Sequence, residues 1–85
     1  MVGPVFIRTV THNYLCEVTG PAADGFLPVE QVSWVADTGV RLGQFLATGP
    51  TSASEIEPMP GCHRIGVGAI IDVSLWTHAL PPTAI

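Results

Sequence analysis

The sequence contains no lysine and little charge of either sign. Three arginines, Arg8, Arg41 and Arg64, stand against seven Asp and Glu residues, and the formal net charge is −4. Nucleic-acid affinity rests mainly on neutralising phosphates with Lys and Arg, so this balance argues against a DNA- or RNA-binding protein. Charged residues make up 12% of the chain, against roughly 25% in an average soluble domain.

Long hydrophobic runs are also missing, although 47% of the residues are hydrophobic. The longest uncharged apolar stretch, residues 65–71 (IGVGAII), is far shorter than the ~20 residues of a spanning helix. The beginning, MVGPVFIR, also lacks the basic region and cleavage site of a signal peptide. On these grounds we expect no membrane partner. A domain of 85 residues has too little interior to hide this much apolar surface. We therefore expect a homo-oligomer or a component of a larger assembly.

Cysteine is scarce, and the candidate metal ligands are poorly spaced. Without a secretion signal, Cys16 and Cys62 are expected to be reduced and partly buried. Zinc ligands usually come in pairs roughly two to four residues apart with converging side chains. His12 and Cys16 are four residues apart, but they lie on an expected turn and strand, where their side chains need not converge. His78 stands alone, and Cys62 and His63 are neighbours whose side chains point to opposite faces of a strand. We expect no metal, no cofactor and no enzymatic activity.

The first third of the chain predicts β-structure. Residues 5–20 are rich in β-branched and aromatic side chains, with a turn or bulge at His12-Asn13. Alternation in YLCEV places Tyr14, Cys16 and Val18 on one face of a strand. A loop at 20–25 then leads to a further strand over 26–36.

The spacing of the apolar residues changes after Asp37. Apolar residues recur at helical spacing, Asp37 or Thr38 is a good N-cap, and Gly49-Pro50 is a standard stop, which predicts a helix of about ten residues. Gly43 weakens this helix by roughly 1 kcal/mol relative to alanine. A short strand follows at 55–61, and a late strand at 63–76 contains two glycines that suggest a bend.

These elements predict a mainly β protein with one short helix (α+β). The expected architecture is a small curled antiparallel sheet or an SH3-like partial barrel. We expect residues 1–76 to form a single domain and residues 77–85 to form an extended, polyproline-like C-terminal arm.

Asp37-Thr38-Gly39 is also the tripeptide of retroviral-type aspartic proteases, in which two chains each contribute one carboxylate. In such a protease the chain continues into a strand, whereas residues 40–50 have helical spacing and a stop. A helix cap is therefore the favoured interpretation. A homodimeric aspartic protease using Asp37 remains the enzymatic alternative.

The two tryptophans, Trp34 and Trp76, each end an expected strand, and one of them is expected to fill the core. Trp76 leads into the apolar arm THALPP. We predict that this arm docks onto a neighbouring subunit. The predicted partner-binding residues are Trp76, His78, Leu80, Pro81 and Pro82.

Four strings taken together resemble a family of small uncharacterised proteins of tailed bacteriophages: RTVT at 8–11, WVADTG at 34–39, EIEP at 55–58 and IIDVSLWTHALP at 70–81. In that family pattern Arg directly follows the glycine, whereas here Val40 precedes Arg41. The resemblance implies a head component, such as a cement or decoration protein at the capsid surface of the virion. Its partner would be the major capsid protein, after synthesis in the host cytoplasm. A small SH3-like or Sm-like interaction module is the remaining alternative.

Overall fold

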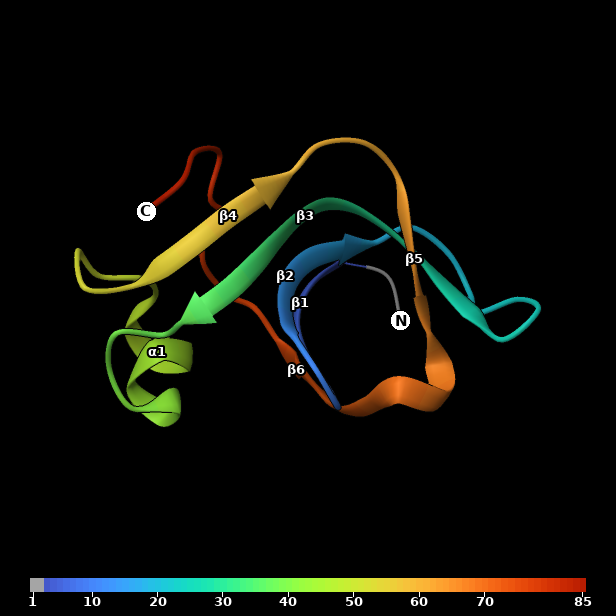
Figure 1. The fold of residues 1–85 in the computed structure, drawn as a ribbon, viewed down its shortest axis with the longest axis horizontal. Helices are drawn as coiled ribbons and strands as arrows, with labels where there is room; N and C mark the ends of the chain where they lie inside the picture. Colours follow the sequence, from blue (N-terminus) through green and yellow to red (C-terminus); the bar gives the residue numbers. More distant parts are fainter. Residues whose placement is uncertain (1–2) are drawn as a thin grey trace.

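The fold was analysed in a computed structural model that describes residues 3–85 (Figure 1). A six-stranded antiparallel sheet dominates it, which confirms the mainly β prediction. The elements are β1 (Gly3–Thr9), β2 (Asn13–Val18), β3 (Phe26–Asp37), α1 (Leu42–Thr48), β4 (Glu55–Met59), β5 (His63–Gly66), the 3-10 turn η1 (Val67–Ala69) and β6 (Ile70–Leu75).

Strands pair in the order β4-β3-β2-β1-β6, and β5 also pairs with β3. Among the described strands the sheet curls without closing into a barrel, because β6 pairs with β1 alone. At the opposite edge, Ile85 exchanges backbone hydrogen bonds of 3.0 and 3.1 Å with Ile56 of β4. Within residues 3–85, Ile85 therefore bridges the β4 edge at Ile56, whereas β5 pairs with β3 alone and β6 with β1 alone.

The curl originates in β3, a twelve-residue strand that changes partner along its length. Its first part pairs with β5 from Phe26 to Val29, and its second part pairs with β4 from Val32 to Asp37. Between the two parts Gln31 has φ of 50°, a left-handed conformation that is uncommon for residues other than glycine. The ladder to β2 changes register over the same stretch, as expected for a bulge that bends a strand.

Apolar side chains on the two faces of the sheet form two separate cores. Alternation along β1 sends Val5 and Ile7 to one core and Phe6 to the other. The first core lies within the curl and includes Cys16 and Val18, with Tyr14 packed against it, as the YLCEV pattern predicted. The full set of buried members is Val5, Ile7, Cys16, Val18, Val29, Val32 and Ile65.

The second core lies beneath α1 and the C-terminal segment. Phe45 of α1 contacts Phe6 edge-on, with ring centroids 5.7 Å apart, and lies 5.2 Å from the ring of Trp76. Leu15, Val35 and Ile56 complete its buried members. A single helix of seven residues would be marginal alone, so its tertiary contacts hold it in place.

Two boundaries differ from the sequence-based prediction. The predicted strand 63–76 is broken by η1 around Gly68, where the two glycines had indicated a bend. The helix begins at Leu42 with Arg41 as its N-cap residue, not at Asp37 or Thr38. It ends at Gly49 as predicted, where the Gly49 N–H donates to the Phe45 carbonyl at 2.8 Å.

Candidate partner-binding grooves

Trp76, the predicted anchor for a partner, belongs to the protein's own core. Its side chain is 4% exposed, and its indole N–H donates to the Ala79 carbonyl at 3.2 Å. The segment after β6 is therefore not a projecting arm, and Trp76 is not free to dock onto a neighbour. The apolar Trp76 side chain, which suggested a docking arm, is thus buried by the chain itself.

The other predicted partner-binding residues divide into two groups. The His78 ring donates from Nε2 to the Leu46 carbonyl at 3.0 Å and packs edge-on against Trp76, so it satisfies a carbonyl of the last turn of α1. Leu80 is half-buried against the second core. Together with Pro81 and Pro82 it lines an open groove at the surface.

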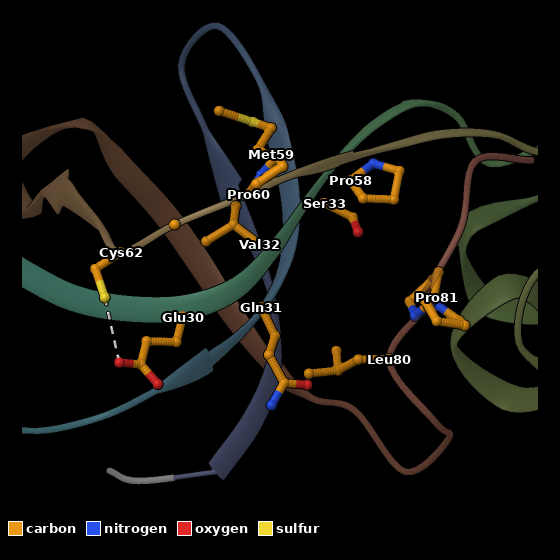
Figure 2. A pocket seen from close by; sticks show the side chains of 12 residues that line it. Glu30, Gln31, Val32, Ser33, Pro58, Met59, Pro60, Cys62, Leu80 and Pro81 are labelled. Atoms are coloured by element: carbon orange, nitrogen blue, oxygen red, sulfur yellow. Dashed lines mark hydrogen bonds between the residues drawn. The ribbon is translucent and has the colours of Figure 1, made fainter.

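This groove, which we call the proline groove, lies between the C-terminal segment and the bend where β3 pairs with β4 and β5 (Figure 2). It has a volume of about 480 Å³. Four prolines contribute to its wall: Pro58, Pro60, Pro81 and Pro82. Because proline has a restricted backbone, such a wall is already ordered before any ligand binds.

The polar groups of the proline groove come from the bend in β3. Glu30 and Gln31 line it, and Figure 2 shows Glu30 at the end of the groove next to Cys62, away from Pro81. The Cys62 thiol donates to Glu30 Oε1 at 3.3 Å. This hydrogen bond, reinforced by the negative charge of Glu30, raises the pKa of the Cys62 thiol. The thiol therefore stays protonated at neutral pH, and Glu30 gives this end of the groove an acidic character.

A second hollow, the aromatic groove, shares the lining segment Pro58–Pro60 with the proline groove and has a volume of about 510 Å³. Its aromatic wall is formed by three side chains from the turn before β2 and from neighbouring strands. The His12 ring stacks on Tyr14 at 6.0 Å and meets Trp34 edge-on at 5.6 Å. Trp34 is half-buried, so the surface tryptophan of this protein is Trp34, which the sequence analysis did not select. Each tryptophan was expected to end a strand, and the sequence offered no signal that distinguished them.

The Asp37-Thr38-Gly39 corner is held by local hydrogen bonds. The Gly39 N–H donates to Asp37 Oδ1 at 2.8 Å, and the Thr38 hydroxyl donates to the Val40 carbonyl at 2.6 Å. These bonds close a turn between β3 and α1, so neither side chain caps the helix. The buried hydroxyl of Ser54 donates to the Thr38 carbonyl at 2.7 Å and ties this turn to the loop before β4.

The candidate metal ligands are spread over the structure. Cys16 is buried in the first core, where burial raises the pKa of its thiol to about 12. His63 bonds through Nε2 to the carbonyls of Met59 and Pro60, at 3.2 and 3.1 Å. Cys16 and Cys62 do not form a disulfide. Within residues 3–85, no three His, Cys, Asp or Glu side chains gather in a way that could hold a metal ion.

No family model matches the chain, and no curated protein or solved structure matches it either. No helix between residues 3 and 85 combines the length and the apolar character needed to span a membrane. The fold is a small, mainly β domain, and its proline and aromatic grooves share the segment Pro58–Pro60.

Proposed function

We propose that the protein is a structural binding protein, a cement or decoration subunit that binds and stabilises the head shell of a bacteriophage. The observation that carries this proposal is the proline groove, an open, preformed and largely apolar surface built from both the sheet and the C-terminal segment. The ligand would be an extended, mainly apolar segment of the major capsid protein. Glu30 would face a basic residue of that segment, because it places a negative charge at one end of the groove.

Such binding would have a low entropic cost, because the groove is already ordered before the ligand arrives. A groove walled by prolines loses little conformational freedom when a ligand binds, so more of the contact energy appears as affinity. A subunit that binds the assembled shell and not its dissociated parts stabilises the shell by linkage. Because the stabilising contributions of many copies on one shell add up, a modest affinity for each site would be sufficient.

The viral context is supported by the four sequence strings that resemble small bacteriophage proteins. Two of them are visible in the structure as local features. WVADTG forms the end of β3 and the corner before α1, and IIDVSLWTHALP forms β6 and the start of the C-terminal segment. The low charge of the chain fits a protein whose surface is partly covered in an assembly.

Binding to shells can be tested with two charge variants in the proline groove and two matched controls. Pro82→Glu adds a negative charge to the apolar wall, and Glu30→Arg reverses the charge at the acidic end; both residues are exposed. The controls, Pro21→Glu and Glu55→Arg, make the same changes at exposed positions outside both grooves.

We expect both groove variants to co-sediment less with assembled heads than the wild type, while the controls bind normally. Heads carrying wild-type protein should also resist heating better than bare heads. Equal binding by all five proteins would exclude the proline groove as the shell-binding surface. Failure of the wild type to bind any assembled head would contradict the proposed function itself.

A further inference from the structure

Strand β6 forms an edge of the sheet and exposes apolar side chains along its length. Ile71 is 60% exposed, Val73 40% and Leu75 66%. Within residues 3–85, β6 pairs with β1 and with no other strand. We call these three residues the β6 edge stripe. They lie outside both grooves.

The backbone of β6 also presents free hydrogen-bonding groups at this edge. The Trp76 N–H donates to the Pro4 carbonyl at 3.1 Å. In an antiparallel ladder, residues that bond the neighbouring strand alternate with residues that turn their N–H and C=O away. Ser74, opposite Phe6, therefore bonds towards β1, whereas Val73 and Leu75 direct their backbone groups outward.

Within the part of the chain that the structure describes, β6 lacks the features that usually prevent edge-to-edge pairing. Proteins commonly protect an edge with lysine, proline, an inward charge or a covering segment. The β4 edge has such protection, since Pro58 lies in the strand and Ile85 pairs with Ile56. The one charged side chain of β6, Asp72, is already engaged by Arg8 of β1.

We propose that β6 pairs antiparallel with β6 of a second copy of this chain, across a two-fold axis at Val73. The segment Ile71–Leu75 reads apolar, polar, apolar, polar, apolar, so it is symmetric about Val73. A two-fold interface requires this kind of self-complementary surface. Pairing places Val73 opposite Val73 of the second copy, and Ile71 opposite Leu75 of the second copy.

The polar positions of the strand are compatible with a second copy as the occupant. In this register Asp72 lies opposite Ser74 of the second copy, whose hydroxyl can donate to the carboxylate. No like charges lie directly opposite each other, because Asp72 is the only charged residue of the strand. The outward N–H and C=O groups of Val73 then pair with those of the same residue in the other chain. The contact involves one six-residue strand on each side, so it belongs among interfaces below about 1,200 Å², which are typically weak and reversible.

The inference is independent of shell binding and can be tested on the isolated protein. We expect sedimentation equilibrium to show a monomer–dimer transition as concentration rises from micromolar to millimolar. Amide hydrogen exchange at Val73 and Leu75 should slow several-fold over the same range. The Ser74 amide, which bonds to β1, should be protected at both ends of the range.

Two charge variants at Val73 test whether the two-fold axis lies at this residue. Val73→Lys places like charges opposite each other in the dimer, so this variant should stay monomeric. Val67→Lys is the matched control, since Val67 is 43% exposed and lies in η1, and it should dimerise like the wild type. Val73→Glu should also be monomeric alone, but an equimolar mixture with Val73→Lys should form a heterodimer.

A wild type that is monomeric throughout, or a Val73→Lys dimer of normal strength, would overturn the proposal. A mixture of the two charge variants that stays monomeric would overturn the two-fold axis at Val73. If Val73→Lys fails to fold, the exchange data on the wild type decide, and unprotected Val73 and Leu75 amides at high concentration would reject the pairing.

Discussion

Gly39 lies at the corner between β3 and α1 in a conformation that other residues rarely adopt. Its φ is 76°, and a Cβ atom at this position would lie 2.5 Å from backbone atoms of Ala53 and Ser54. The corner is therefore pressed against the loop before β4, and the small size of glycine permits the contact. The same tripeptide that resembles a protease motif thus has a structural role here, in which Asp37 and Thr38 close the turn.

Substitution of Gly39 by alanine should destabilise the protein strongly, by at least 1–3 kcal/mol, because it combines backbone strain with a clash against backbone atoms. Gly43→Ala is the matched control. Gly43 is exposed within α1 and has open space where a Cβ would lie, so this change should stabilise by about 0.5–1 kcal/mol. Urea unfolding followed by circular dichroism would measure both. Equal effects of the two substitutions would contradict the packing of the corner.

At the scale of elements, the C-terminal segment is part of the domain. Trp76 follows β6 into the second core, His78 bonds to α1, and Ile85 pairs with β4. The segment thus connects α1 to both β4 and β6, the first and last strands in the sheet order. Its removal would take away part of the core, so a truncation at Trp76 is not a clean test of partner binding.

Trp76→Ala should therefore lower the free energy of unfolding by about 3–5 kcal/mol, as typical for a large aromatic side chain removed from a core. Trp34→Ala should cost clearly less, because Trp34 is half-buried at the aromatic groove. Denaturant titrations of the two variants provide the comparison. A larger loss for Trp34→Ala would mean that the assignment of core and surface tryptophan is reversed.

Much of the sheet was predictable from the sequence because alternation is a local signal. The pattern of YLCEV predicted which side chains of β2 face the first core, and Gly49 predicted the end of α1. The start of α1 was not predictable in the same way. Asp37 has the side chain of an N-cap, but Gly39 turns the chain first, and its position depends on contact with Ala53, which is distant in sequence.

The candidate grooves were only partly predictable for a related reason. Leu80, Pro81 and Pro82 were selected from the sequence and do line the proline groove. The opposite wall depends on the bend at Gln31, which brings β4 and β5 to different parts of β3. Such a bend has no clear local pattern. Composition alone could not decide whether Trp34 or Trp76 would be covered by the chain's own segments.

At the scale of the whole molecule, the ion pair between Arg8 of β1 and Asp72 of β6 links the first strand to the last. The two residues are separated by 64 positions, and Arg8 Nε donates to Asp72 Oδ1 at 2.8 Å. The hydrogen bond from Arg8 lowers the pKa of Asp72, and the pKa of Arg8 is raised in turn. Because the pKa of Asp72 is lower in the folded than in the unfolded chain, the ionised carboxylate stabilises the fold above the unfolded pKa. This contribution is lost as the pH falls through the folded pKa.

Asp72→Asn should therefore lower the melting temperature at neutral pH, and its difference from the wild type should shrink as the pH falls through the acidic range. Both side chains are partly exposed, Arg8 39% and Asp72 42%, so the effect should be modest and should weaken with added salt. Asp24→Asn, in the loop before β3, controls for the loss of one negative charge. Melting curves at low protein concentration avoid any contribution from strand pairing. A pH-independent difference would show that Asp72 acts through something other than its charge.

The bridge between Ile85 and Ile56 has a consequence for how many molecules can join. A chain with two open sheet edges could add copies at both ends, and such head-to-tail addition grows without limit into a fibre. Here the β4 edge is occupied at Ile56 by Ile85, and β6 can pair with only one further strand. Strand addition through β6 would then stop at two molecules. The Ile85–Ile56 bridge would thus hinder addition of a further copy at β4 and favour a closed pair over fibrous growth.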